Sequence, residues 1–362
     1  MATRWERVQA FRARHAKKEI ALFLGVGFLW DVTTLGRIDD ATTLLSQLGY
    51  LSVLGWLLAL DERWSLGASP PRFFAGIWTL KEDILHFLFG ALLSCYAIFY
   101  FKSSSGPFSL LFIVGMFAVL ILNELPRFRS RGHRLRIGLF SFCLTSWFAY
   151  LLPVLFGFVG LSLFLGAVLL SFLPIAGLYA MIRRAGGGMR QAFKNALMPA
   201  ILVQGVLIGL YLAGAIPPVP LAIQEIGIYH GVEKDGADWM LLRRESSWTN
   251  HFRPTRYFQA RPGDRVYCFV RVFAPRAFRD RIRLRWSYRD PVAGWQTWDS
   301  IPLTIQGGRE GGFRGYAWKE HYTPGVWSVQ IETADGREIG SVKFRILEDG
   351  SVDERVFETD PA

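Results

Sequence analysis

Long apolar runs fill the first 216 residues and constrain the fold more than any other feature of this chain. A helix needs about 20 apolar residues to cross the ~30 Å hydrocarbon core of a bilayer, because each residue adds about 1.5 Å. Seven runs approach that length, at 20–38, 42–60, 84–101, 107–125, 137–157, 158–181 and 198–216. The sequence therefore predicts a polytopic α-helical membrane bundle of about seven spans over 20–216, preceded by a basic segment at 1–19.

The run at 20–38 is the weakest, because Asp31 interrupts it. A charge near the centre of a span costs about 2.5–3.5 kcal/mol on insertion scales. Two interpretations of Asp31 stay open: an intramembrane carboxylate that relays protons or binds a cation, or an interfacial residue near the outer end of a short span. We count the run as spanning because of the charge distribution that follows.

Lysine and arginine indicate the orientation, since both are retained on the cytoplasmic side of short loops. With seven spans, one side holds eighteen Lys and Arg residues, whereas the other holds only Arg37 and Lys102. This split predicts a cytoplasmic N-terminus. An odd number of spans then places the C-terminal domain outside the cytosol.

The formal net charge of +11 could suggest binding to nucleic acid. Residues 1–220 supply nearly all of it, with 20 Lys and Arg against 10 Asp and Glu, whereas residues 221–362 hold 21 against 20. The basic excess thus belongs to the loops of the membrane half. We expect the lipid bilayer as partner and no nucleic acid.

Residues 221–362 alternate apolar and polar side chains, which is typical of strands with one buried face. The clearest example is DRIRLRWSYRD at 280–290. It places Ile282, Leu284, Trp286 and Tyr288 on one face and Arg281, Arg283, Arg285 and Arg289 on the other. Further strands are predicted at 221–232, 264–275, 300–306, 313–320, 325–333 and 339–346, with an Asp-Gly hairpin turn in ADGRE at 334–338.

Seven or eight short strands without helical patterns between them predict an all-β, immunoglobulin-like sandwich of two antiparallel sheets at 224–348. Before it, AIPPVP at 215–220 ends the last span, because proline lacks the amide that continues a helix. A proline-containing linker is therefore expected at 217–223. The acidic segment 349–362 is expected to be disordered.

The hairpin region PGVWSVQIETADGREIGSVKFRI at 324–346 resembles the closing signature of a bacterial family, domain of unknown function 2914. The resemblance extends upstream through RLRWSYRD, GWQTWDSIPLTI and FRGYAWK. The membrane half resembles a second family, domain of unknown function 5924. Neither resemblance implies an activity, a cofactor or a catalytic residue; members of the first family commonly carry this domain at the C-terminus, sometimes after a membrane region. Together with the charge distribution, we expect a multi-pass protein of the bacterial inner membrane with a periplasmic C-terminal domain.

Ionisable residues near the spans are candidates for an intramembrane polar site. Asp83 and His86 lie one helical turn apart, a spacing compatible with a proton relay, although acidic residues at 82 and 83 can also simply stabilise a helix N-terminus. Glu124 ends a span and can pair with an arginine of the following loop. Gln204 is expected to hydrogen-bond to a neighbouring helix.

In the β domain, Trp295 and Trp298 lie near Gly294 and are the tryptophans expected to be exposed, whereas Trp286 and Trp327 are expected in the core. A candidate binding surface combines the two exposed tryptophans with the basic stripe of Arg281, Arg283 and Arg285. The alternative is a solvated sheet face. GGREGG at 307–312 lacks the Lys and the following helix of a phosphate loop and is predicted to be a flexible hairpin.

No catalytic motif or metal-ligand spacing appears, so no metal or cofactor is expected and an enzyme is disfavoured. The favoured function is an envelope binding or scaffolding protein that presents the β domain to a protein or glycan partner. The alternatives are a transporter or channel that uses the intramembrane polar residues, and a membrane enzyme acting on lipid or glycan. The oligomeric state does not follow from the sequence.

Overall fold

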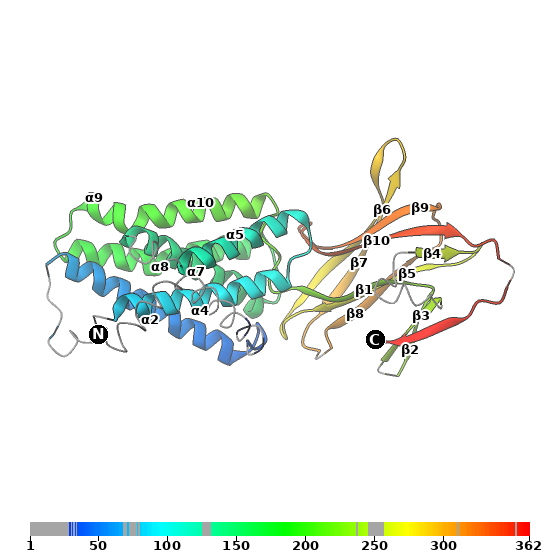
Figure 1. The fold of residues 1–362 in the computed structure, drawn as a ribbon, viewed down its shortest axis with the longest axis horizontal. Coiled ribbons are helices and arrows are strands. Elements are labelled where there is room, and N and C mark those ends of the chain that lie inside the picture. Colours follow the sequence, from blue (N-terminus) through cyan, green and yellow to red (C-terminus); the bar gives the residue numbers. More distant parts are fainter. Residues whose placement is uncertain are drawn as a thin grey trace, which may run out of the picture. The chain divides into compact units, whose positions relative to one another are not determined.

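The structure, a computed structural model of the 362-residue chain (Figure 1), describes most residues from 35 onward. The described ranges are 35–67, 80–124, 132–236, 238–244, 257–309, 311–351 and 353–362, together with Leu29, Asp31, Thr33, Pro71 and Trp78. The chain divides into two compact units. The helical unit holds most of the first 216 residues, and the β unit holds 217–362 with the short segments 102–110 and 153–161.

The helices of the helical unit lie along one common direction (Figure 1). They are α2 (Ala41–Ser65), α4 (Lys81–Lys102), α5 (Pro107–Glu124), α7 (His133–Phe156), α8 (Leu161–Arg184), α9 (Met189–Ala192), the π-helical turn η1 (Phe193–Leu197) and α10 (Met198–Leu212). Five helical segments are long and apolar enough to cross a membrane: α2, α4, α7, α8 and the continuous stretch Met189–Leu212. Each of the five overlaps a predicted span.

The prediction of about seven spans is matched only in part. The run at 107–125 forms α5, whose apolar stretch Ser109–Leu122 is shorter than the other five candidates. Residues 20–28 of the first predicted span lie outside the described residues. Five candidate spans are therefore shown within the described part of the chain, and the other two stay predictions.

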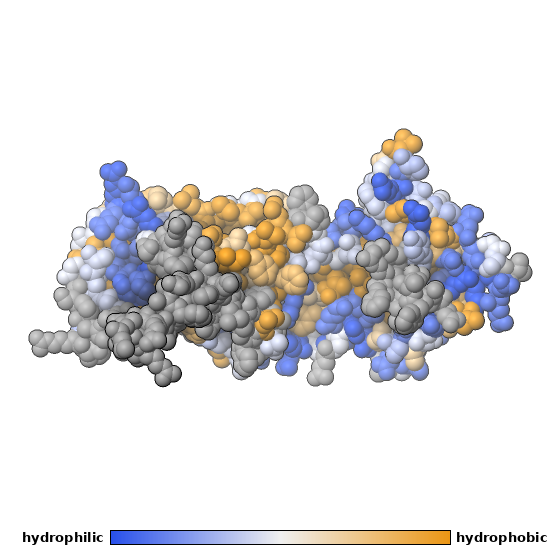
Figure 2. Space-filling view, in the orientation of Figure 1, coloured by the Kyte–Doolittle hydropathy of each residue, from blue (hydrophilic) through white to orange (hydrophobic). Residues whose placement is uncertain are grey.

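On the face drawn in Figure 2, apolar side chains cover the middle of the helical unit, and hydrophilic ones lie at its end. Leucines on three helices point outward, and Leu169 on α8 is 70% exposed; Leu111 on α5 and Leu202 on α10 are similarly open. Water-soluble proteins rarely expose apolar surface on this scale, because it is costly to hydrate. The outward leucines and the apolar helix lengths together indicate a membrane-embedded region.

The β unit contains three sheets. The largest has the strand order β4-β10-β9-β6-β7, and the others are β1-β5-β8 and β11-β3-β2. The strands are β1 (Ala222–Tyr229), β2 (Gly231–Asp235), β3 (Asp238–Arg244), β4 (Tyr257–Ala260), β5 (Val266–Phe273), β6 (Arg279–Asp290), β7 (Gly294–Gln306), β8 (Phe313–Lys319), β9 (Gly325–Thr333), β10 (Glu338–Glu348) and β11 (Phe357–Pro361).

One hydrophobic core draws on the five-stranded sheet and on the sheet β1-β5-β8. Ile282, Leu284 and Trp286 of β6 are buried, as the alternating pattern predicts. Val270 and Val272 of β5 belong to the same core, so apolar residues of the two sheets share it. The predicted β9–β10 hairpin is confirmed, since the strands pair antiparallel around Asp335 and Gly336, where Gly336 adopts φ +82°.

The third sheet differs from the predicted two-sheet arrangement. The expected strand at 221–232 breaks at His230 into β1 and β2, and β2 pairs with β3. Residues 349–362 were expected to be disordered, yet β11 pairs antiparallel with β3. Its acidic side chains find a basic partner there, because Arg243 Nη2 lies 2.9 Å from Glu358 Oε2. The described strands thus number eleven instead of the predicted seven or eight. One pair, β4 with β10, is parallel, whereas the prediction was of antiparallel sheets. The immunoglobulin-like arrangement stays a prediction.

Replacing Leu284 with alanine tests the assignment of the two faces of β6. Leu284 is fully buried, so Leu284→Ala should lower the free energy of unfolding of the β unit by about 2–5 kcal/mol. Arg283→Ala, at the neighbouring exposed position, is the matched control and should change it by about 0.5 kcal/mol or less. Denaturant unfolding of the detergent-solubilised full chain, followed by tryptophan fluorescence, measures both. Equal losses from the two variants would contradict the assignment.

Candidate functional site

The arginines of the predicted basic stripe share one face of the five-stranded sheet, here called the outer face. Directly paired residues of antiparallel strands lie on the same side of a sheet. Arg283 and Arg285 pair with Glu332 and Gln330 of β9, which pair in turn with Glu338 and Ser341 of β10. The outer face comprises Arg281, Arg283, Arg285 and Arg289 of β6, Trp295, Thr297, Ser300, Pro302 and Thr304 of β7, Ser328, Gln330 and Glu332 of β9, and Glu338, Ser341, Lys343 and Arg345 of β10.

Basic side chains outnumber acidic ones on this surface. It carries six Lys and Arg residues against Glu332 and Glu338. Arg285 forms an ion pair with Glu332, and its Nη2 donates a hydrogen bond of 2.8 Å to Oε1 of Gln330. Burial raises the pKa of the Glu332 carboxyl, and the nearby charge of Arg285 opposes that rise. The outer face therefore carries a net positive charge.

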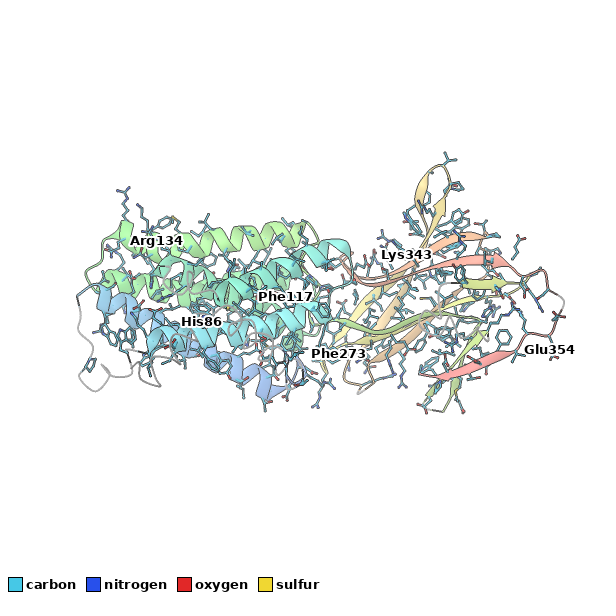
Figure 3. The ribbon with its side chains drawn as sticks, in the orientation of Figure 1. His86, Phe117, Arg134, Phe273, Lys343 and Glu354 are labelled. Carbon is cyan, nitrogen blue, oxygen red and sulfur yellow. The ribbon has the colours of Figure 1, made fainter. Side chains whose placement is uncertain are left out.

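The two tryptophans of the candidate surface lie in different surroundings. Trp295 pairs with Arg289 and so belongs to the outer face, where Lys343 Nζ lies 5.8 Å from its ring centroid (Lys343 is labelled in Figure 3). Trp298 instead contacts the rings of Tyr288 and Trp327. Both tryptophans are exposed, at 43% and 46%. Trp295 therefore shares the outer face with the arginines, whereas Trp298 packs against Tyr288 and Trp327 and does not belong to that face.

The predicted intramembrane residues are spread over the helical unit. Asp31 is half-buried before α2, and Asp83 and His86 lie on the first two turns of α4 (His86 is labelled in Figure 3). Glu124 is the last residue of α5, and its side chain lies outside the described part of the chain. The role of these four residues in an intramembrane site stays a prediction.

Charged residues instead form a cluster where three helices end or begin, here called the charge cluster. Lys81 forms an ion pair with Asp61, and Arg136 Nη1 lies 3.6 Å from Asp61 Oδ2. His133 Nε2 lies 3.2 Å from Oε2 of Glu62, which is buried. The cluster comprises Asp61 and Glu62 of α2, Lys81 and Glu82 of α4, and His133 and Arg136 of α7. Three carboxylates face two permanent cations and one histidine, so these six groups are neutral when His133 is protonated.

The π-helical turn η1 connects the charge cluster to α10. Asn195 of this turn donates a hydrogen bond of 2.8 Å from Nδ2 to Oε1 of Glu62, and its Oδ1 accepts a bond of 3.2 Å from Arg134 Nε. Figure 3 labels Arg134 at this end of the helical unit. A π-helical turn shifts side chains by a fraction of a helical turn and is frequent at functional sites. Here the π-helical turn places the side-chain amide of Asn195 within hydrogen-bonding distance of the buried Glu62 carboxylate.

Gln204 of α10 joins two neighbouring helices in the interior, as predicted. Its Nε2 lies 2.9 Å from the hydroxyl of Ser141 on α7 and 2.9 Å from the hydroxyl of Ser171 on α8. Gln204 is 2% exposed, and its Oε1 has no hydrogen-bond partner among the described residues. An amide oxygen buried without a partner is costly, above all where no bilayer water can reach it.

The sequence does not by itself predict the charge cluster, although it contains the charged residues at the right helix ends. The sequences DER at 61–63 and HRLR at 133–136 flank apolar runs on the same predicted side of the membrane. Facing helix ends on one side are the places where opposite charges can meet, but the sequence does not say which ends are neighbours. Within the described residues, no group of three or more His, Cys, Asp and Glu side chains is arranged to hold a metal ion.

Removing one cation tests whether the charge cluster holds the helices together. Arg136 is mostly buried and faces Asp61 and Glu82, so Arg136→Met should destabilise the helical unit by about 1–3 kcal/mol, less than the 3–5 kcal/mol of a fully buried pair. Arg134→Met on the same helix is the matched control, because Arg134 is exposed, and should have a smaller effect. Thermal unfolding in detergent, followed by far-UV circular dichroism, compares them. Equal shifts would contradict a structural role for the cluster.

Comparison with known proteins relates only the β unit to a family. No curated protein matches the sequence. Among solved structures, the alkylpurine DNA glycosylase AlkC of Pseudomonas fluorescens, bound to DNA containing an abasic site analog, aligns with 86% of this chain and 100% of its own at 10% identity. The TM-score of that alignment is 0.22, too low to carry any argument about fold or function.

Residues 279–346 match the family described as protein of unknown function (DUF2914). The match runs from the first residue of β6 to Ile346 in β10 and so contains most of the five-stranded sheet. It includes the hairpin and the RLRWSYRD strand that carried the resemblance in the sequence. The C-terminal region of this chain therefore carries the sequence signature of the DUF2914 family.

Proposed function

We propose that the protein is a multi-pass protein of a bacterial inner membrane that presents its β unit outside the cytosol, where the outer face binds an acidic glycan of the envelope. The observation that carries the proposal is the composition of the outer face, on which six basic side chains and an exposed tryptophan accompany only two carboxylates. The helical unit then acts as the membrane anchor.

The charge cluster supports the orientation. Its ion pairs join the end of α2 to the starts of α4 and α7, and the hydrogen bond from Asn195 to Glu62 brings η1 to the same place. These helix ends therefore lie at one end of the helical unit. The basic segments at 127–136 and 183–194 adjoin the same helix ends, which favours the cytoplasmic side. Because α10 starts at that end, it finishes at the opposite one, and the chain continues from there into the β unit.

The spacing of the arginines favours an extended ligand. Outward residues of one strand repeat every second position, so Arg281, Arg283 and Arg285 attach to the backbone about 6.6–6.8 Å apart. A row of cations on a flat sheet suits a polymer with repeated negative charges more than a compact anion. Carboxylates bind arginine in a bidentate manner, and the Trp295 indole offers a flat apolar surface against which a sugar ring can stack.

Charge removal tests this surface. The triple substitution Arg281→Ala, Arg283→Ala and Arg289→Ala should weaken binding of the detergent-solubilised full chain to polygalacturonate by at least about tenfold, on the order of 1.4 kcal/mol. Arg265→Ala, outside the outer face, is the control. Binding should also weaken with added salt, since exposed charges are screened. Biolayer interferometry with neutral dextran as reference measures these effects; equal binding of the triple variant would rule out the outer face.

A transport function is the second candidate, and the buried Oε1 of Gln204 is the observation that favours it. A buried amide oxygen that has no hydrogen-bond partner among the described residues can accept a bond from water or coordinate a passing ion. In that case, proteoliposomes containing the protein should conduct potassium or protons faster than empty vesicles, and Gln204→Leu should abolish the difference. Flux equal to that of empty vesicles would exclude a passive pathway for these ions.

A further inference from the structure

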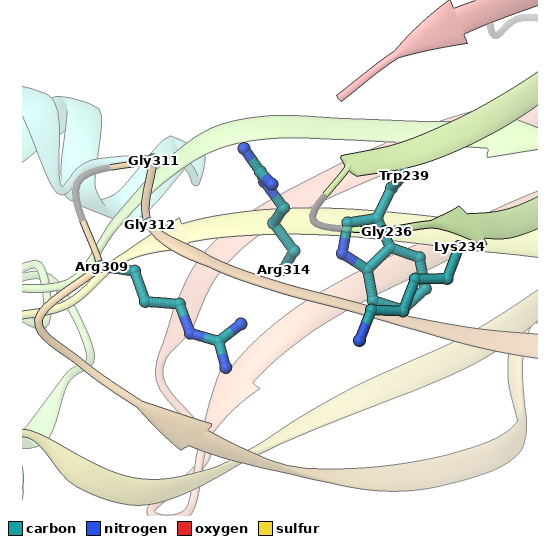
Figure 4. Close-up of a pocket in the computed structure, with 7 residues that line it drawn as sticks. All are labelled: Lys234, Gly236, Trp239, Arg309, Gly311, Gly312 and Arg314. Carbon is teal, nitrogen blue, oxygen red and sulfur yellow. The ribbon is translucent and has the colours of Figure 1, made fainter.

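The cavities of the two units differ in the side chains that line them. In the β unit, Arg309 of the GGREGG segment lines a cavity together with Arg314 and Lys234, and Figure 4 shows the two guanidinium groups pointing apart. In the helical unit, a cavity of about 410 Å³, here called the apolar cavity, is lined by α2, α7 and α8 (these helices are labelled in Figure 1). No charged side chain is among its described lining residues.

The walls of the apolar cavity consist mainly of hydrocarbon and aromatic surface. Phe140 and Trp147 line it from α7. The hydroxyl of Ser52 on α2 also lines it, but this hydroxyl already donates a hydrogen bond of 2.7 Å to the carbonyl oxygen of Leu48. Trp56 on the same helix lines the cavity and is 50% exposed, so the cavity opens to the surface of the helical unit. Such walls suit a hydrocarbon chain that enters from the bilayer.

Two glycines shape the apolar cavity. At Gly55 of α2, a Cβ would lie 2.9 Å from Cζ of Phe140, so the glycine lets α2 approach α7 closely. At Gly177 of α8, a Cβ would have no neighbouring atom within 4 Å, so a side chain at this position would project into open space. Both glycines line the cavity. Gly55 therefore closes one side of the cavity, and Gly177 keeps another side open.

The length of the apolar cavity matches the thickness of one leaflet. Leu48 and Ala59 are the first and last lining residues of α2, and eleven residues of helix are about 16 Å long. The hydrocarbon core of a bilayer is about 30 Å thick, so one leaflet contributes about half of that length. Ala59 lies one helical turn before Glu62 of the charge cluster. The cavity therefore runs from near the charge cluster to about the middle of the bilayer.

Two exposed arginines continue the lining faces beyond this end of the apolar cavity. Arg63 lies four positions after Ala59 on α2, and Arg184 lies three positions after Met181 on α8. Residues three or four positions apart share a helix face, so each arginine extends a face that lines the cavity. Neither arginine has an ion pair or a hydrogen bond among the described residues. The carboxylates of the charge cluster already face the cations of that cluster, so these two arginines are left for another anion.

We propose that the apolar cavity, together with Arg63 and Arg184, binds one anionic phospholipid from the leaflet at the charge-cluster end. One acyl chain lies in the cavity, and the headgroup phosphate meets the two guanidinium groups, which bind phosphate oxygens well. Basic sites between membrane helices bind anionic headgroups in this way. Charge complementarity thus favours an anionic lipid over a neutral one. The proposal requires only that the helical unit is embedded in a bilayer, and it does not depend on the outer face.

Native mass spectrometry of the detergent-solubilised full chain tests the headgroup site. The protein is titrated with phosphatidylglycerol and, separately, with phosphatidylcholine that carries the same acyl chains. We expect one tightly bound phosphatidylglycerol per chain, with an affinity at least about tenfold above that for phosphatidylcholine. Arg63→Ala combined with Arg184→Ala should abolish this preference and leave the fold intact, since both positions are exposed. Arg190→Ala, at an exposed position of α9, is the matched control and should bind like the wild type.

Gly177→Leu tests the acyl-chain site independently of the charges. The leucine side chain would occupy part of the apolar cavity and should lower the affinity for phosphatidylglycerol by at least about tenfold. Gly49→Leu is the matched control, because a Cβ at Gly49 also has no atom within 4 Å, but Gly49 does not line the cavity. Equal affinities of the wild type for the two lipids, or wild-type binding by either the arginine double variant or Gly177→Leu, would overturn the proposal.

Discussion

Hydrocarbon offers no hydrogen-bond partner, and this constraint shapes the helical unit. Its backbone is helical along each candidate span, and many leucines and other large apolar residues lie exposed on its surface. Polar side chains inside the unit must find partners among themselves, as Gln204 does with Ser141 and Ser171. Full charges gather at the helix ends, where Asp61, Lys81 and Arg136 meet.

The β unit shows the alternation of buried and exposed side chains that is typical of strands with one face in water. Alternation along β6 buries Leu284 and Trp286 and leaves the intervening arginines outside. The outward positions are then free to carry charge, and the outer face uses this freedom. On the outer face, the arginines of β6 stand in a row along one strand of the sheet. This arrangement suits an extended anion.

The sequence predicts the features that depend on local patterns. The apolar runs of five candidate spans, the alternation of β6 and the Asp-Gly turn between β9 and β10 all depend on neighbours within a few residues. The sequence does not predict the separate sheet of β2, β3 and β11. These segments alternate only weakly, and their strands are defined more by pairing with one another than by their own apolar residues. The acidic tail illustrates this, since Glu358 is ordered by Arg243, a residue more than one hundred positions earlier.

The candidate sites are harder to predict for the same reason. The arginines of the outer face follow from the strand period, but the period does not reveal that Trp295 joins them while Trp298 turns to Tyr288 and Trp327. A bulge between Trp286 and Ser287 changes the register of β7 at that point. The charge cluster combines helices that are far apart in the sequence, so only the fold brings its residues together.

The orientation of the β unit is the claim on which the proposed function depends most directly. A fusion of alkaline phosphatase after Ala362 through a flexible linker, paired with the same fusion of a fluorescent protein that matures only in the cytosol, measures it. We expect active phosphatase and no fluorescence, with the reverse pattern for fusions truncated after Arg184 at the opposite end of the helical unit. A fluorescent full-length fusion with inactive phosphatase would contradict the account, because the outer face would then lie in the cytosol.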